Sequence, residues 1–397
     1  MFISAEVAEV VVENGRAQGV RMRRDNAILR APIVISDAGW VVDGARRNTV
    51  RVVDIGTLVL DESRGPDPYP SRRDQPAVLT FVMGSDGTLK GAVHSPAEIL
   101  AGADTYARHV LNLTASDICV GTTGLAWAFG LGALLTFPLR AGATTLLLDG
   151  PVQLLQAIAD ERPTVLFSVP TMYRMLLQHP DLERWDLTPL RCSVSAAEPL
   201  PPAVVEEWRR RTGLDIVDGF GTTELTHIVI SARPGEVRPG YIGTVVPGYE
   251  ARIVDATMRD VADGTPGLLA VRGPTGARYW RDAEAQRRVV RDGWTLTGDV
   301  CVRHADGWFQ HVSRSDSLVV SAGYKISVRE VERVLEDHPD VASARVFPVP
   351  DSIRGSTTKA VVVPAAGVDT RDLAERLQRY LKAELAAFKC PRDIQVA

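Results

Sequence analysis

The residues best suited to chemistry form one short run, Asp218-Gly219-Phe220-Gly221-Thr222-Thr223-Glu224. Its glycines let the backbone come close to a ligand, and its amides and hydroxyls can bind phosphate oxygens. The carboxylate of Glu224 can hold Mg²⁺ beside the phosphates. The apolar residues just before it, Leu214, Ile216 and Val217, are typical of a strand, so we expect the run to form a turn after that strand. Glycine-rich turns are common, and the motifs elsewhere in the chain therefore decide what this one does.

The composition is that of a globular protein with room for two or three domains. The chain has 397 residues, of which 45% are hydrophobic and 24% charged, and its net charge is -4. This charge argues against nucleic-acid binding, and no apolar run reaches the ~20 residues that span a bilayer. The first residues do not resemble a signal peptide, and the four separated cysteines suggest neither zinc nor a disulfide framework. We expect a cytoplasmic protein that binds no nucleic acid and no membrane.

The elements that must position the run follow a regular order. From about residue 77 to 217, strand-like and helix-like segments alternate, which predicts a mostly parallel sheet covered by helices. From about 240 to 312, strands alternate with Gly, Asp and Pro turns, which predicts a β-rich subdomain. The segment 314–397 predicts a small α+β domain. The fold class is therefore α/β, with a large domain of several subdomains and a small C-terminal lid. The expected strands are 78–83, 144–148, 165–169, 214–217, 344–348 and 359–363, and the expected helices are 96–110, 152–160, 201–211, 328–338 and 370–387.

Several motifs occur in an order that resembles one family. From about residue 77 onward, the sequence resembles the adenylate-forming (AMP-binding) superfamily, and within it the benzoate and 2-aminobenzoate CoA ligases. The resemblance implies ATP, Mg²⁺ and CoA as cofactors, a small carboxylic acid as substrate, and CoA or another acceptor. The segments that carry it are 195–200, 218–224, 297–299, 313–317 and 321–326.

The resemblance implies a nucleotide site and its catalytic groups. Phe220 would stack on adenine, Asp218 would accept the adenine amino group, and Asp299 would accept the ribose hydroxyls. Lys90, Glu224 and Lys325 are the implied catalytic residues, and Glu224 is also the implied metal ligand. Ala197 stands where the family usually has glycine. The implied nucleotide-binding residues are Gly84, Ser85, Gly87, Ala197, Glu198, Asp218, Gly219, Phe220, Gly221, Thr222, Thr223, Asp299 and Arg314.

The resemblance also implies a pocket for the acid. Trp127, Phe129 and Tyr173 would enclose an aromatic ring, as aromatic pairs prefer. His227 would form a further wall, and Gly243 would lie near the carboxylate.

A moving lid is the last implied feature. Asp316 would be the hinge on which the C-terminal domain rotates between adenylation and thiol transfer. Gly323 and Tyr324 would line the CoA channel, where glycine leaves room for a pantetheine arm.

Three departures from the family pattern qualify this interpretation. In the phosphate loop, Val82 and Met83 replace hydroxyl residues, and Asp86 replaces a threonine. Two like charges ~4 Å apart repel by about 4 kcal/mol at an effective dielectric of 20, so an ionised Asp86 would weaken ATP binding unless Mg²⁺ or Lys90 compensates. The family's C-terminal glycine-lysine motif, whose lysine assists adenylation, would lie beyond Ala397. Neither Lys325 nor Lys389 matches that lysine.

The third departure is the N-terminal segment, which predicts two strands around a turn at Asn14-Gly15. Residues 11–20 and 31–38 resemble a fragment of a phytoene-desaturase-type flavin oxidoreductase, although no GxGxxG fingerprint accompanies them. We therefore divide the chain into an oxidoreductase-like fragment (1–50), a truncated AMP-binding N-terminal domain (51–313, with a linker at 61–76) and a truncated lid (314–397).

Together these features predict ATP-dependent activation of an aromatic carboxylic acid, such as a benzoate, followed by transfer to CoA. Two alternatives stay open. One is a catalytically impaired nucleotide-binding relative, or a fragment that needs a partner chain. The other is an adenylating enzyme that passes the acyl group to an amine in secondary metabolism. The sequence also leaves open a homodimer or a complementing subunit.

Overall fold

The computed structural model describes residues 70–84, 88–148, 153–315, 318–365 and 367–397, together with five short strands in the first 54 residues. The chain forms two compact units, residues 3–72 and residues 73–397. Within the described residues, no helix is both long and apolar enough to cross a membrane.

The N-terminal unit contains the hairpin that the sequence predicts. Strand β1 (Val7–Glu13) pairs antiparallel with β2 (Arg16–Met22), and β2 pairs with β3 (Ile28–Leu29). Strands β4 (Val34–Ser36) and β5 (Val52–Asp54) form a separate parallel pair. The proposed limits of the N-terminal fragment and of the linker remain predictions.

A seven-stranded sheet is the centre of the second unit. Strands β12, β11, β10, β8 and β9 are parallel neighbours, and β13 and β14 extend the sheet in the antiparallel sense. The α/β prediction is therefore confirmed. The strands are β8 (Ile118–Gly121), β9 (Thr144–Leu146), β10 (Val165–Ser168), β11 (Cys192–Ser195), β12 (Ile216–Gly221), β13 (Ile228–Ser231) and β14 (Thr244–Val245).

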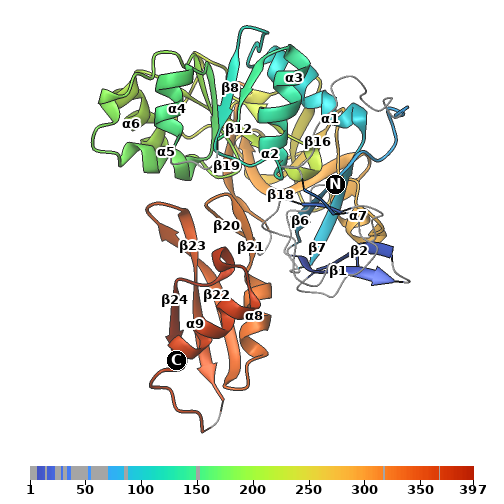
Figure 1. Cartoon of the computed structure of the whole chain (residues 1–397), viewed down its shortest axis with the longest axis vertical. Coiled ribbons are helices and arrows are strands. Elements are labelled where there is room, and N and C mark those ends of the chain that lie inside the picture. The colour runs from blue at the N-terminus through green and yellow to red at the C-terminus, as the bar shows by residue number, and fades with distance from the viewer. Residues whose placement is uncertain are drawn as a thin grey trace. The chain divides into compact units, whose positions relative to one another are not determined.

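Helices cover both faces of this sheet, as Figure 1 shows. Alternate residues of a strand point to opposite faces, so Phe167 joins one core cluster with Phe137, while Leu166 joins the other with Trp208. One face carries α1 (Pro96–Gly102), α2 (Ala128–Leu131) and α3 (Phe137–Ala141), and the other carries α4 (Leu154–Glu161), α5 (Pro170–Leu177) and α6 (Pro202–Thr212). The helix expected over 96–110 changes after Gly102 into a π-helical turn, Ala103–Ala107, and a second such turn, Gly132–Thr136, separates α2 from α3.

The β-rich region is also observed. Five strands form one antiparallel sheet, in the order β15-β16-β18-β17 with β19 paired to β18, and the hairpin β6–β7 stands beside it. One short helix, α7 (Ala283–Val289), interrupts the strands. The strands are β6 (Val78–Met83), β7 (Leu89–His94), β15 (Glu250–Val254), β16 (Gly267–Arg272), β17 (Val290–Arg291), β18 (Trp294–Arg303) and β19 (Phe309–Arg314).

The C-terminal residues have a hydrophobic core of their own. In helix α9, Leu373, Leu377 and Leu381 recur every four residues and are fully buried, which explains why this stretch folds as an amphipathic helix. The elements are β20 (Leu318–Ser321), β21 (Tyr324–Ser327), α8 (Val328–Glu336), β22 (Val341–Asp351), β23 (Gly355–Pro364), α9 (Leu373–Glu384) and β24 (Asp393–Val396).

Candidate functional site

The carboxyl ends of the parallel strands gather polar side chains at one edge of the sheet, which is where ligands bind in α/β folds. Thr122 follows β8, and its hydroxyl lies 2.7 Å from that of Ser168 at the end of β10. Thr171, just beyond β10, donates to a carboxylate oxygen of Glu198, just beyond β11, at 2.8 Å. Glu224 follows β12. This edge therefore brings together motifs that lie far apart in the sequence.

The run from Asp218 to Glu224 differs from the turn that the sequence predicts. Strand β12 continues through Gly221, because Gly219 and Phe220 pair antiparallel with β13. A side chain at Gly221 would place its Cβ 2.0 Å from the His227 carbonyl oxygen, so this glycine is required by strand packing. The turn comes later, at Thr223–Leu225. Our prediction of a turn over the whole run was therefore wrong, because β13 pairs with its first half.

Glu224 is held in its ionised form. The hydroxyl of Tyr279 donates to Glu224 Oε1 at 2.8 Å. Burial opposes the charge, but the nearby charge of Lys325 and the hydrogen bond from Tyr279 keep the pKa of Glu224 below its ordinary value. A charged carboxylate at this position is a suitable anionic ligand for Mg²⁺.

Asp299 lies in a second cluster, at the pairing of β18 with β19. Arg314, directly opposite on β19, donates to Asp299 Oδ2 at 3.1 Å, and His311 donates to Oδ1 at 3.1 Å. Burial opposes the charge of Asp299, but the hydrogen bond from His311 and the charge of Arg314 lower its pKa. The His311 ring also stacks on Phe220, with 6.5 Å between centroids. His311 therefore contacts both Asp299, the residue predicted to bind ribose, and Phe220, the residue predicted to stack on adenine.

Glu198 is also a buried carboxylate, but its pKa is raised, whereas those of Glu224 and Asp299 are lowered. Its side chain is only 2% exposed, its nearest cation is Arg174 at 3.8 Å, and its Oε1 has no hydrogen-bond partner among the described residues. Burial outweighs the hydrogen bond from Thr171 and raises the pKa of Glu198 to about 7. The neighbouring Ala197 has a φ of 73°, in the left-handed region that favours glycine. This backbone conformation explains why the family pattern has glycine there.

The phosphate loop is only partly described. Gly84 donates its amide to the Thr88 carbonyl at 2.8 Å, whereas Ser85, Asp86 and Gly87 lie outside the described residues. Lys90 pairs with Asp282 at 3.0 Å. A phosphate would have to compete with Asp282 for this lysine.

The predicted aromatic pocket is not assembled as expected. Phe129 lies beside His227, with 5.3 Å between ring centroids. Trp127 makes an edge contact at 5.5 Å with Tyr324, the residue predicted for the CoA channel. Tyr173 lies elsewhere: its ring is fully buried against Trp208 and its hydroxyl donates to the Val194 carbonyl at 2.9 Å. The structure therefore places Tyr173 in the hydrophobic core, where Trp208 of α6 covers its ring.

Gly243 has a packing role. Its φ is 130°, and a Cβ there would lie 1.9 Å from the Ser231 carbonyl carbon. The close approach to β13 explains the glycine, and the cavity described below does not include it.

The lid hairpin β20–β21 contributes two of the predicted residues. Gly323 has a φ of 80°, and a Cβ built on it would lie 3.7 Å from Glu198 Oε1. Lys325 is close enough to influence the pKa of both Glu224 and Asp299. Asp316, the predicted hinge, lies outside the described residues.

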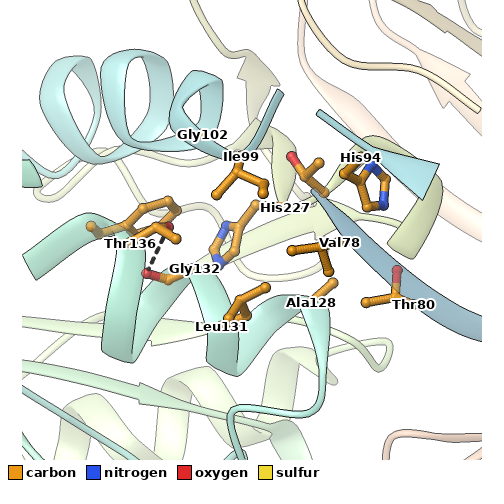
Figure 2. Close-up of a pocket in the computed structure, with 12 residues that line it drawn as sticks. Val78, Thr80, His94, Ile99, Gly102, Ala128, Leu131, Gly132, Thr136 and His227 are labelled. Carbon is orange, nitrogen blue, oxygen red and sulfur yellow. Dashed lines mark hydrogen bonds between the residues drawn. The ribbon is translucent and has the colours of Figure 1, made fainter. Parts of the chain in front are cut away.

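A narrow cavity of about 20 Å³ is lined by His227, which was predicted as a pocket wall, and by several residues to which the sequence motifs assign no role (Figure 2). His94 and Thr80 come from the β6–β7 hairpin, Gly132 and Thr136 from the turn between α2 and α3, and His227 from the segment before β13. No spacing rule links residues from such distant segments. Tyr279, the partner of Glu224, lies in a segment (278–280) that resembles the family but to which the sequence assigned no role, and His311, the partner of Asp299, was missed.

The described residues are consistent with a Mg²⁺ ion shared with a nucleotide. They contain no cluster of three or more His, Cys, Asp or Glu side chains that could bind a metal alone. Mg²⁺ typically binds one or two carboxylates together with substrate phosphates. Glu224 supplies one carboxylate, and the hydroxyl of the neighbouring Thr222 is buried beside it.

Comparison with known proteins agrees with this geometry. The family described as AMP-binding enzyme matches residues 4–280, and the family described as AMP-binding enzyme C-terminal domain matches residues 330–397. The chain therefore belongs to the AMP-binding (adenylate-forming) enzyme family, close to the benzoate CoA ligases. The first match begins at residue 4, so it includes the residues that we compared with a flavin oxidoreductase.

Three relatives illustrate the similarity. Benzoate–CoA ligase of Thauera aromatica is 33% identical over 86% of this chain and 66% of its own length. The amide bond synthetase McbA of Marinactinospora thermotolerans has a TM-score of 0.80 and 31% identity, over 92% of this chain and 72% of McbA. The anthranilate CoA ligase AuaEII, in complex with anthranoyl-AMP, has a TM-score of 0.61 and 34% identity, over 82% of this chain and 63% of AuaEII. The chain spans less than two thirds of the length of the first curated relatives that it matches, 66% for the Thauera ligase and 58% for a human acyl-coenzyme A synthetase.

Proposed function

We propose that the chain activates a carboxylic acid with ATP and transfers the acyl group to CoA. One observation carries the proposal: His311 stacks on Phe220 and donates to Asp299 at 3.1 Å, and the charge of Lys325 lowers the pKa of both Asp299 and Glu224, so three separate motifs converge on one place. Such convergence is what a nucleotide site requires. The relatives named as CoA ligases support the same activity.

In this proposal the reaction has two steps. A carboxylate oxygen of the acid attacks the α-phosphorus of ATP, and pyrophosphate leaves. The thiol of CoA then attacks the acyl carbon, and AMP leaves. Asp299 accepts hydrogen bonds from the ribose hydroxyls and Arg314 holds Asp299 in place. Glu224 would hold a Mg²⁺ ion, which would supply positive charge to neutralise the phosphates. Lys325 adds positive charge beside the reacting groups.

The aromatic nature of the acid is a finer part of the proposal. Phe137 and His227 line the cavity, with 4.4 Å between their ring centroids, and offer flat apolar surface to a ring. The cavity is too small for a ring in the observed conformation, so nearby side chains must move when the acid enters.

Exchange of labelled pyrophosphate into ATP tests the first step. We expect acid-dependent exchange by the 397-residue chain with at least one benzoate. Glu224→Ala should reduce it at least a hundredfold, because that carboxylate is the proposed metal ligand. Glu236→Ala, at an exposed position, is the matched control. The proposed activity is refuted if no acid supports exchange above the level of the Glu224→Ala variant. ATP binding without pyrophosphate exchange would instead favour the alternative of a catalytically impaired nucleotide-binding relative.

A second acceptor deserves a direct test, because McbA, an amide bond synthetase, has a similar fold over most of this chain. If the chain is an amide synthetase, an amine should yield an amide when CoA is omitted. If it is a CoA ligase, the acyl-CoA product should form only when CoA is present. Product analysis by mass spectrometry separates these outcomes.

A further inference from the structure

Helix α5 carries a buried arginine, Arg174, to which neither the motifs nor the proposed reaction assigns a role. Only 9% of its surface is exposed. Burial lowers the pKa of its guanidinium, while the charges of Glu198 and Asp351 act in the opposite direction. Arginine stays protonated in proteins, and buried charges need partners. The contacts of Arg174 therefore indicate what this residue holds.

The partners of Arg174 come from two regions that are far apart in the sequence. Within the large domain, Nη1 lies 3.8 Å from Oε2 of Glu198, which follows β11. From the lid, the Ile353 carbonyl oxygen accepts a hydrogen bond from Nη1 at 2.7 Å. Gly355, the first residue of β23, leaves room for the guanidinium, since a Cβ there would lie 3.1 Å from Nη2. Arg174 therefore contacts both Glu198 and the β22–β23 turn of the lid.

The β22–β23 turn is held in one shape and is attached to a second lid segment. Oδ1 of Asp351 accepts hydrogen bonds from the backbone amides of Ile353 at 2.9 Å and Arg354 at 2.7 Å, as aspartate often does in turns. The Arg354 carbonyl oxygen accepts a hydrogen bond from the amide of Ala322 at 3.3 Å. Ala322 belongs to the tip of the β20–β21 hairpin. A short chain of contacts thus connects Arg174 with that hairpin.

The tip of the β20–β21 hairpin is a tight two-residue turn. Ala322 and Gly323 have φ values of 48° and 80°, the left-handed conformation that such turns need. Strand pairing places Lys325 opposite Val320, just beyond the turn. The position of Lys325 therefore follows from the position of the tip.

The same tip lies against the nucleotide site described above. A Cβ at Gly323 would be 3.7 Å from Oε1 of Glu198, the carboxylate that also lies beside Arg174. The charge of Lys325 favours the ionised forms of the two other carboxylates of that site. Arg174 thus contacts the lid at one turn, while Lys325 reaches the site from the neighbouring hairpin.

Resting on the proposed function, we propose that Arg174 is a positioning residue for the reaction. It binds the β22–β23 turn of the lid, and through the β20–β21 hairpin it keeps Lys325 beside Glu224 and Asp299. Arg174 itself touches neither the nucleotide nor the acid in this proposal. Its effect on the reaction passes through Lys325, which distinguishes it from a residue that only stabilises the fold.

The distance between the lid and the large domain tests the contact without any substrate. The four native cysteines are buried, so spin labels can be attached selectively at Glu206→Cys on α6 and Arg379→Cys on α9, two exposed positions. Double electron-electron resonance should show one dominant distance when Arg174 is present. Arg174→Met should reduce that population by at least half. An unchanged distance distribution overturns the inference.

The kinetics of acyl-CoA formation show whether the effect passes through Lys325. Arg174→Met should lower kcat about tenfold and leave the KM of the acid within about twofold, while Arg174→Lys, which can still donate to the carbonyl, should recover part of the loss. In a Lys325→Met background, Arg174→Met should cost about twofold or less, because the residue it positions is absent. Arg210→Met, at an exposed position, is the control and should change neither constant. An equal loss of kcat in both backgrounds, or a rise in KM without a fall in kcat, overturns the inference.

A pair of lid glycines provides a second perturbation that leaves Arg174 in place. Gly355→Ala introduces a methyl group 3.1 Å from Nη2 of Arg174 and should reduce both the dominant distance and kcat, as Arg174→Met does. Gly367→Ala is the matched control, because its φ of 82° is close to the 76° of Gly355 and no described atom lies within 4 Å of its Cβ position. The two variants share the backbone strain and differ in the contact. Equal effects of the two would contradict the role of Arg174.

Failure of the proposed function gives a different pattern, because no acid would then yield acyl-CoA even with Arg174 present. In that case the labelled distances decide the inference alone. Loss of the dominant distance in Arg174→Met and Gly355→Ala, but not in Gly367→Ala, supports it. Equal distances in all the variants overturn it.

Discussion

Replacing Glu198 by glutamine should change how the stability of the protein depends on pH. The folded protein holds this carboxyl with a pKa of about 7, against an ordinary 4.5, because burial disfavours its charge. The difference corresponds to about 3 kcal/mol. Between pH 4.5 and 7 the folded state retains a proton that the unfolded state has lost. Stability from this group therefore falls as pH rises through that interval.

Urea unfolding at a series of pH values from 4.5 to 8 measures the effect, with the fluorescence of the buried Trp208 as one probe. Glutamine can still accept from Thr171 and never ionises. The free energy of unfolding of Glu198→Gln, relative to wild type, should therefore increase by about 3 kcal/mol from the lowest to the highest pH. Glu206→Gln, on an exposed face of α6, is the control and should show no such trend. A constant difference between Glu198→Gln and wild type would refute the reasoning.

Three further changes have definite expected results. Tyr279→Phe removes the donor that orients Glu224 and should raise the Mg²⁺ concentration for half-maximal pyrophosphate exchange about tenfold; an unchanged Mg²⁺ dependence would contradict this role. Ala197→Gly relieves a positive φ and should raise the free energy of unfolding by about 1 kcal/mol in urea titrations, whereas a loss of stability would show that the methyl group contributes packing. Burial opposes the charge of Asp117, but hydrogen bonds from Arg191 and Thr164 outweigh burial and lower the pKa of Asp117 to about 2. About 2 kcal/mol of the free energy of unfolding, present above pH 3.8, should therefore be lost as the pH falls toward 2. Asp117→Asn should remove that acid-induced loss, and its persistence in urea unfolding between pH 5 and 2 would argue against it.

Local sequence patterns were sufficient for most of the fold. The buried strand Val165–Ser168 and the amphipathic helix Leu373–Glu384 are predictable because apolar residues alone determine which surfaces they bury. The run from Asp218 was harder, because its first half is fixed by pairing with β13, a tertiary contact that no local pattern reveals. The π-helical turn at Ala103–Ala107 directly follows Gly102, but an isolated glycine in a helical pattern does not reveal that the hydrogen-bond spacing changes there.

The site required more than the sequence could supply. Motifs indicated Glu224 and Asp299, but their partners Tyr279 and His311 are 55 and 12 residues away. Residues 278–280 resemble a segment of the same family, yet the sequence assigned Tyr279 no role, and His311 belongs to no motif. Tyr173 illustrates the opposite case. An aromatic residue near a pocket helix can serve either the pocket or the core, and only its contact with Trp208 distinguishes the two.

The charge balance around Lys90 bears on whether the nucleotide site can function. Lys90 is the cation that the family pattern assigns to the phosphates, yet it pairs with Asp282. The two side chains are 14% and 29% exposed, so the pair is partly buried, and breaking it costs on the order of 1 kcal/mol, somewhat more than for a fully exposed pair. A triphosphate accompanied by Mg²⁺ presents a far larger charge and can displace one carboxylate at that cost. The contact with Asp282 is therefore no obstacle to ATP binding. Whether the triphosphate binds depends instead on the residues between Gly84 and Thr88, where Asp86 replaces a hydroxyl residue.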